Sequence, residues 1–149
     1  MKKTVLLGFM CMAVLDFLSA QTANELDAIL NTQEITCSQA VHIVLTAAEV
    51  LPEGGNDIFM AAKDRRWLSA KTEADNPIQL GELSLLIMKA FEIKGGVMYA
   101  WFPNPRYACR ELAYLQIIQG RIDPEGRMDG RTFLQILGRA LAYTGGDGG

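Results

Sequence analysis

The feature that most constrains the fold of this chain is a pattern of apolar residues that occurs three times in the same register. When Ile35, Ile78 and Met128 are taken as position zero, apolar residues follow at positions five, eight, nine, twelve and thirteen of each copy. This spacing places them on one face of an α-helix. They are Ala40, Ile43, Val44, Ala47 and Ala48, then Leu83, Leu86, Ile87, Ala90 and Phe91, then Phe133, Ile136, Leu137, Ala140 and Leu141. Because one such helix cannot bury its apolar face alone, we expect the three copies to share one core.

Each of these predicted helices has a helical partner before it and a glycine pair after it. Glycine readily adopts the left-handed conformation that ends a helix. The pairs are Gly54-Gly55, Gly95-Gly96 and Gly145-Gly146. The residues expected to face inward in the partner segments are Leu26, Ile29 and Leu30, then Phe59, Ala62 and Trp67, then Tyr107, Ala108, Leu112, Leu115 and Ile118. The sequence therefore predicts an all-α fold of three helix–loop–helix units, at about residues 21–54, 55–95 and 96–146, with a disordered tail at 147–149.

The first twenty residues have the order of a secretory signal peptide. The positive start Met1-Lys2-Lys3 precedes an apolar run over residues 4–18, and Ser19-Ala20 supplies small residues before a polar stretch. We expect a peptidase to remove residues 1–20, which places the protein outside the cytoplasm, in the periplasm or on the cell surface. The alternative is that the run stays uncleaved as an anchor, although it is short for a bilayer span.

The charge of the chain limits its partners. The formal net charge is −3 at pH 7. A mildly acidic surface argues against nucleic acid as a partner and gives no polybasic patch for anionic lipid. No segment after the signal peptide is long and apolar enough to span a membrane, so we expect no membrane span after cleavage.

Two cysteines, Cys37 and Cys109, follow the predicted signal peptide. An exported protein reaches a compartment that permits disulfides. Two interpretations stay open, because sequence spacing alone does not establish proximity. The two residues are either small buried thiols, or they form one disulfide between the first and third units.

Sequence motifs for metals and cofactors are missing. His42 is the one histidine, and Cys37 is the one candidate ligand near it, five residues away on the same predicted helix. The loop at residues 123–130 holds three carboxylates but lacks the ligand spacing of an EF-hand, so we expect a turn there rather than a Ca²⁺ site. The glycines follow helices and do not form a phosphate-binding loop. We expect no metal and no cofactor.

The third unit resembles a repeat of a known family. Its first helix contains Ala113-Tyr114 and ends in Ile117-Ile118-Gln119-Gly120, its loop reads Asp123-Pro124-Glu125-Gly126-Arg127, and its second helix includes Arg139-Ala140-Leu141. This order is similar to that of the S-layer homology (SLH) repeat, and the resemblance extends over most of the chain after the signal peptide. It implies a pseudo-threefold bundle of three repeats that acts as a non-enzymatic anchoring module, bound to wall polymer or peptidoglycan.

The start of each second helix departs from the family pattern. SLH repeats typically read Ile-Thr-Arg-Ala-Glu there, and the Arg contributes to the glycan site. The corresponding positions here are 35–39, 78–82 and 128–132, and none has Arg in third place. What remains are capping residues: Thr36 and Gln39 predict a capping box, and Asp129 predicts a cap for the third helix. We therefore expect an envelope protein as partner in preference to wall glycan.

The residues expected to bind a partner are aromatic residues and arginines. Trp101, Phe102, Arg106 and Tyr107 form the densest aromatic segment, which has no counterpart in the other units. Such residues stack on sugar rings or bind partner proteins. The alternative is that Trp101 and Phe102 fill a gap between units. Arg65 and Trp67 form a second candidate, for which the alternative is a solvated helix face.

Two functional hypotheses follow. The first is an exported, non-enzymatic adaptor or anchor of the cell envelope. Because the three predicted units occupy the given sequence after the signal peptide, we expect an adaptor in preference to a module that tethers a cargo domain. The second is a small enzyme acting on envelope polymers, with acid and base drawn from Glu82, Glu111 and Asp123. Because no catalytic motif accompanies these carboxylates, we expect that the protein is not an enzyme.

Overall fold

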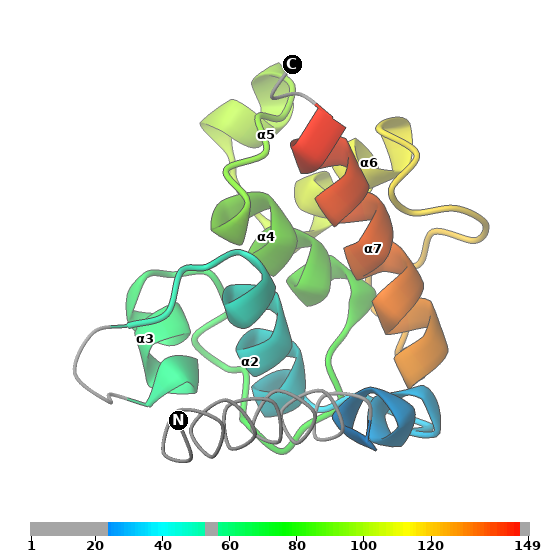
Figure 1. The fold of residues 1–149 in the computed structure, drawn as a ribbon. Helices are drawn as coiled ribbons and strands as arrows, with labels where there is room; N and C mark the ends of the chain where they lie inside the picture. The colour runs from blue at the N-terminus through cyan, green and yellow to red at the C-terminus, as the bar shows by residue number, and fades with distance from the viewer. Residues whose placement is uncertain (1–23, 53–56, 147–149) are drawn as a thin grey trace, which may run out of the picture.

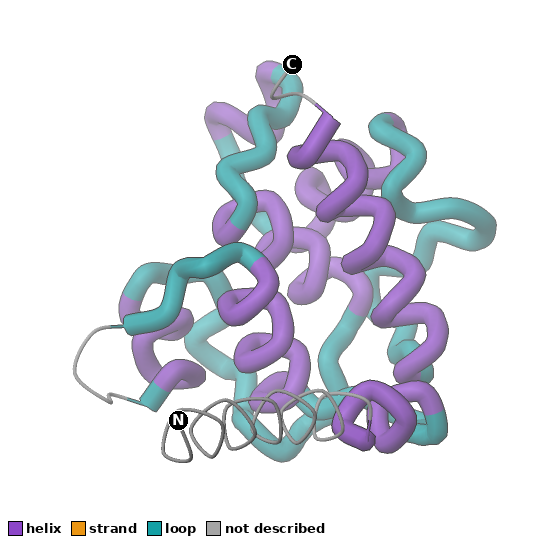
Figure 2. Tube along the Cα trace, viewed as in Figure 1, coloured by secondary structure: helices purple, strands orange, loops and turns teal. Residues whose placement is uncertain are grey.

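The computed structural model of the protein describes residues 24–52 and 57–146. The predicted signal peptide at 1–20, the Gly54-Gly55 pair and the tail at 147–149 lie outside the described residues. The described part is mostly helical, with no strand beyond two isolated bridges, which confirms the predicted all-α class. Figure 2 shows helices joined by loops throughout these ranges.

The helices surround one central member, α4 (Figure 1). Nine of its eleven residues are buried. It packs most extensively against α6 and also against α2, while α2 packs against α3, and α5 packs against α6. The described helices are a short segment at residues 24–30, α2 (Cys37–Ala47), α3 (Ile58–Asp64), α4 (Leu80–Ala90), α5 (Val97–Trp101), α6 (Pro105–Tyr114) and α7 (Gly130–Gly146).

The threefold apolar pattern supplies much of the core. Positions zero, five and nine are buried in all three copies, with Val44, Leu83 and Phe133 fully inaccessible to solvent. The nine residues are Ile35, Ala40, Val44, Ile78, Leu83, Ile87, Met128, Phe133 and Leu137. The expectation was wrong for Leu141, at the last position of the third copy, which is exposed. It was also wrong for Leu26 and Leu30, which are exposed because the helix at 24–30 lies at the edge of the molecule (Figure 1).

The glycine pair Gly95-Gly96 does not end α4 as predicted. Helix α4 ends at Ala90, and Glu92 takes the left-handed conformation with φ 53°. The Ile93 amide then donates to the Met88 carbonyl at 2.9 Å, and the Ile93 side chain is buried. This is the bonding pattern of a Schellman cap, and burial of Ile93 holds it in place before Gly95 is reached. Glu49 ends α2 in the same way, with the Val50 amide donating to the Leu45 carbonyl at 3.0 Å. Helix α7 extends to Gly146, so the predicted pair Gly145-Gly146 forms its last two residues.

The loops that precede α2, α4 and α7 are hydrogen-bonded to one another. The Ile78 amide donates to the Ile35 carbonyl at 2.8 Å, and the Ile35 amide donates to the Met128 carbonyl at 3.2 Å. The Leu80 amide donates to the Gly126 carbonyl at 2.8 Å, so each of the three loops bonds to both others. The buried backbone groups at these helix starts are thereby satisfied by neighbouring loops.

The predicted helix caps at α2 and α7 are confirmed. At α2 the Gln39 amide donates to the Thr36 hydroxyl at 3.3 Å, and the Thr36 amide donates to the Gln39 side chain at 3.1 Å. Before α7 the Thr132 amide donates to the Asp129 carboxylate at 2.8 Å. Hydrogen bonds from Thr132 hold the pKa of Asp129 below its usual value. Both caps therefore satisfy amides that lack partners within their own helix.

Candidate functional site

An exposed apolar surface lies on α5, a helix that the sequence pattern did not predict. Val97, Met98 and Trp101 lie one, three and four residues apart, and so share one face of this five-residue helix. Val97 is 71% exposed, Met98 52% and Trp101 75%, and the next residue, Phe102, is 58% exposed. We call these four residues the α5 ridge. Helix α5, which carries it, lies at the top of Figure 1.

The alternative that Trp101 and Phe102 fill a gap between units is wrong. The inward position of α5 is taken by Tyr99, which is buried. Its ring packs against Gly95, where a Cβ would lie 2.6 Å from a ring carbon, and the Lys89 ammonium lies 5.8 Å from the ring centre. Burial raises the pKa of the Tyr99 hydroxyl, which has no hydrogen-bond partner among the described residues. Tyr99 thus fixes α5 to the core and leaves the α5 ridge outside.

A hollow of about 340 Å³ lies beside the ridge and shares Met98 with it. We call it the α5–α6 hollow. Its lining residues are Gly96, Met98, Tyr107, Arg110, Glu111 and Tyr114. Tyr114 is 83% exposed at its rim, and a Cβ on Gly96 would lie 3.0 Å from a carboxylate oxygen of Glu111. The hollow therefore combines aromatic and thioether walls with one arginine and one carboxylate.

The predicted binding residues are distributed over three places. Tyr107 lines the α5–α6 hollow, but its neighbour Arg106 lines a separate hollow of about 460 Å³ with Asn104, Pro105 and the loop at 123–125. Arg65 and Trp67 follow the end of α3, a helix that lies at the left of Figure 1, whereas α5 lies at the top. There the exposed Arg65 guanidinium stacks 5.1 Å from the centre of the half-buried Trp67 ring. The two residues of this second candidate therefore contact each other.

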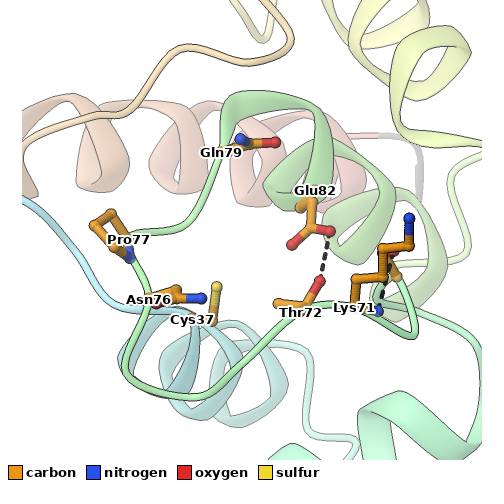
Figure 3. A pocket seen from close by; sticks show the side chains of 8 residues that line it. Cys37, Lys71, Thr72, Asn76, Pro77, Gln79 and Glu82 are labelled. Carbon is orange, nitrogen blue, oxygen red and sulfur yellow. Dashed lines mark hydrogen bonds between the residues drawn. The ribbon is translucent and has the colours of Figure 1, made fainter.

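A polar hollow of about 280 Å³ lies at the start of α4 (Figure 3). We call it the α4 hollow. Its lining residues are Cys37, Ser69, Lys71, Thr72, Asn76, Pro77, Gln79 and Glu82. The Thr72 hydroxyl donates to the Glu82 carboxylate at 2.5 Å, and the Lys63 ammonium donates to the Thr72 carbonyl at 2.9 Å. The sequence pattern did not single out Lys71, Thr72 or Asn76, because they come from a loop without a recognisable motif.

The two cysteines are free thiols in the structure, so the interpretation that they form a disulfide is wrong. Both are buried, Cys37 at the start of α2 and Cys109 within α6. Burial, and secondly the charge of Glu82, raise the pKa of Cys37 to about 12. Burial also raises the pKa of Cys109, against a hydrogen bond with Ser84 that lowers it. Both side chains stay protonated at neutral pH, which makes them poor nucleophiles.

The acidic residues considered for catalysis do not meet. Glu82 lines the α4 hollow and Glu111 the α5–α6 hollow, whereas Asp123 lines hollows formed by the loop before α7. Hydrolysis by a pair of carboxyl groups requires both groups to lie in one site, beside the same scissile bond of the substrate. Within residues 24–52 and 57–146, no group of three His, Cys, Asp or Glu side chains is placed to hold a metal ion. His42 is exposed on α2.

Among the described helices none has the length and apolar character needed to cross a membrane. Comparison with protein-family models finds no matching family. Comparisons with curated proteins and with solved structures find no match either.

Proposed function

We propose that the chain is an exported, non-enzymatic interaction protein of the cell envelope that acts as an adaptor through the α5 ridge. The observation that carries this proposal is the exposure of Trp101 and Phe102 beside Val97 and Met98. Each Å² of apolar surface kept in water costs roughly 25 cal/mol, and clustered exposed apolar residues mark interaction sites. Trp is also the residue type most enriched among the energetically dominant residues of interfaces.

The proposed architecture is a pseudo-threefold bundle of three SLH-like units. Two observations support it. The loops before α2, α4 and α7 bond pairwise to one another, and the residues at matching positions of the three copies are buried. Two further positions match as well, because Glu49 and Glu92, fourteen residues after Ile35 and Ile78, share the left-handed conformation. Export through residues 1–20 belongs to the same proposal.

A protein partner is favoured over glycan by what occupies the family's arginine position. The residues there are Cys37, Leu80 and Gly130, and all three are buried. A buried, uncharged side chain offers no donor to a sugar or to a wall-polymer phosphate. Glycan anchoring remains the second candidate because of the α4 hollow, where Lys71, Asn76 and Gln79 supply polar groups. In that hollow Glu82 is already bonded to Thr72.

The test compares peptidoglycan with envelope protein as the binding target. The protein beginning at Gln21 is incubated with purified peptidoglycan and sedimented, and separately used for co-purification from detergent-solubilised envelopes. We expect it to stay in the supernatant, and a defined co-purifying protein to be lost with Trp101→Ala. Met60→Ala is the matched control, because Met60 is an exposed apolar residue on another helix, α3, and this variant should retain the partner.

Two other results would contradict the adaptor proposal. Sedimentation with peptidoglycan that is lost in Arg106→Ala or Glu82→Gln, with no protein co-purified, would establish glycan anchoring instead. Release of soluble fragments from peptidoglycan would establish the enzyme hypothesis. Because Arg106 and Glu82 line different hollows, the two variants also tell which hollow holds the glycan.

A further inference from the structure

The α4 hollow contains two opposite charges that do not pair with each other. Lys71 and Glu82 both line it, and in the view of Figure 3 Glu82 lies between Gln79 and Lys71. Among the described residues the one ion pair joins Arg127 to Glu34. The Lys71 ammonium and the Glu82 carboxylate therefore have no ion-pair partner there, although they line the same small space.

Glu82 is held in place through one of its two carboxylate oxygens. That oxygen accepts from the hydroxyl of Thr72, a buried residue, at 2.5 Å. The Lys63 ammonium donates to the Thr72 carbonyl at 2.9 Å, which anchors the loop that carries this hydroxyl. Figure 3 shows the other carboxylate oxygen on the side where Cys37 and Asn76 lie. Glu82 thus presents a fixed, charged acceptor to a molecule that enters the hollow.

The carboxylate distinguishes this hollow from a second one at the matching place of the sequence pattern. Lys71 and Arg121 lie seven residues before position zero of their units, and Glu82 and Thr132 lie four residues after it. Arg121 and Thr132 line a hollow of about 320 Å³ before α7. Both hollows therefore have a basic residue at the first position, but a neutral hydroxyl replaces the carboxylate in the second hollow.

The two unpaired charges restrict the ligand. A phosphate or a simple carboxylate would be attracted by Lys71 but repelled by Glu82, and a simple amine would meet the reverse situation. A neutral sugar would displace water from both charges and pair with neither, which is unfavourable. A ligand with one ammonium and one carboxylate satisfies both residues. The volume of about 280 Å³ restricts such a ligand to a small molecule.

We propose that the α4 hollow binds a small zwitterion of the α-amino-acid type, with its ammonium group on the free oxygen of Glu82 and its carboxylate on Lys71. Each contact is a charge-assisted hydrogen bond. The side-chain amides of Asn76 and Gln79, which line the same hollow, supply further donors and acceptors. This ligand site is separate from the α5 ridge and goes beyond the adaptor function.

Thermal unfolding of the protein beginning at Gln21 identifies the ligand. Each common amino acid, in its L and D forms, is added at about 10 mM, because a molecule that binds only the folded state raises the unfolding midpoint. We expect at least one to do so. Isothermal titration calorimetry then compares this amino acid with the amine that lacks its carboxylate and with the acid that lacks its ammonium. The amino acid should bind about tenfold more tightly than either, because each of them loses one charged contact.

Two substitutions identify the partner of each charge. Glu82→Gln keeps an acceptor for the Thr72 hydroxyl but removes the charge, and should weaken binding of both the amino acid and the amine by about tenfold or more. Lys71→Gln should weaken binding of the amino acid by a similar factor, but not that of the amine, which has no group for Lys71 to bind.

Matched substitutions in other hollows serve as controls. Glu111→Gln changes a half-buried glutamate of the α5–α6 hollow, and Arg121→Gln changes the residue that matches Lys71 before α7. Both should leave the affinity for the amino acid within about twofold. Circular dichroism of each variant checks that the fold is retained. If a variant unfolds, the comparison of amino acid, amine and acid on the unaltered protein still tests the inference.

Three results would overturn the inference. The first is that no amino acid raises the unfolding midpoint, and the second is that the acid without an ammonium group binds as tightly as the amino acid. The third is tighter binding of the amino acid to Lys71→Gln, which would mean that Lys71 itself enters the hollow and pairs with Glu82. Each of these results leaves the adaptor proposal intact, because that proposal is tested at Trp101.

Discussion

Gly130 shows how a single residue is constrained by a distant part of the chain. It is buried at the start of α7, and its amide donates to the Thr32 carbonyl at 3.0 Å. A Cβ at this position would overlap the carbonyl group of Ile29. The backbone at the end of the helix at 24–30 is therefore in direct contact with the backbone of α7, and only glycine leaves room for it.

Gly130→Ala should lower the free energy of unfolding by about 1–3 kcal/mol, because the added methyl group forces two backbone segments apart. Gly138→Ala is the matched control. A Cβ on Gly138 would meet nothing within 4 Å, and Gly138 is in the same helix. That substitution should raise stability by roughly 0.5–1 kcal/mol. Urea unfolding followed by circular dichroism measures both, and equal effects of the two substitutions would contradict the contact.

Cys37 and Cys109 should be unreactive in the folded protein. In the protein beginning at Gln21, Ellman's reagent at neutral pH should detect no fast thiol before denaturation and both thiols after it, without added reductant. Detection of neither thiol after denaturation would mean that a disulfide forms on export.

The raised pKa of Cys37 has a consequence at alkaline pH. Its folded value is about 12 and its ordinary value 9.0, so above pH 9 the unfolded chain loses this proton first. The contribution of this thiol to the free energy of unfolding is therefore complete below pH 9. It declines as the pH rises toward 12, by up to about 1.4 kcal/mol per pH unit for one proton. Cys37→Ala should show a shallower decline between pH 9 and 11 in urea unfolding. An unchanged slope would contradict the assignment to this thiol.

At the scale of single residues, the sequence predicted interactions that depend on neighbours in the chain. The capping box of Thr36 and Gln39 and the cap by Asp129 follow from spacings of three residues. The crowding at Gly130 and the Thr72–Glu82 hydrogen bond join segments that are far apart or separated by an irregular loop. Such pairs have no fixed sequence spacing, so the pattern alone did not reveal them.

At the scale of the elements, helix ends depend on side-chain burial as well as on glycine. The sequence pattern placed the end of α4 at Gly95-Gly96, whereas the helix ends at Ala90 with Glu92 in the left-handed region. That conformation costs a non-glycine residue roughly 1–2 kcal/mol. The buried Ile93, bonded back to Met88, offsets this cost. Helix α5 escaped prediction because one five-residue turn is too short to show a period of its own.

Glu92→Gly should therefore raise the free energy of unfolding, by up to about 1 kcal/mol, since glycine removes the strain but adds chain entropy to the unfolded state. Gln135→Gly, at an exposed position inside α7, should lower it by about 1 kcal/mol. Thermal or urea unfolding of the two variants provides the comparison. Destabilisation by both would show that residue 92 is not held in the left-handed conformation.

At the scale of the whole molecule, the apolar pattern predicted the helical class and most of the core. Val44, Leu83 and Phe133 are fully buried, as expected for a shared centre. The candidate site was predicted in part: Trp101 and Phe102 are exposed together, but Arg106 and Tyr107 line different hollows. Adjacent residues on a helix point about 100° apart, which lets the neighbours Arg106 and Tyr107 line different hollows. Met98, Arg110 and Tyr114 join the site through the packing of α5 on α6.

The central claim is that the α5 ridge contacts an envelope protein, and in-cell photo-crosslinking tests it most directly. A photoreactive phenylalanine analogue replaces Trp101, or Met60 as control, in cells that naturally make the protein. After irradiation we expect one discrete protein adduct from position 101 and none from position 60, because both side chains are exposed but only one lies on the ridge. The absence of an adduct at 101, or the same adducts at both positions, would contradict the account.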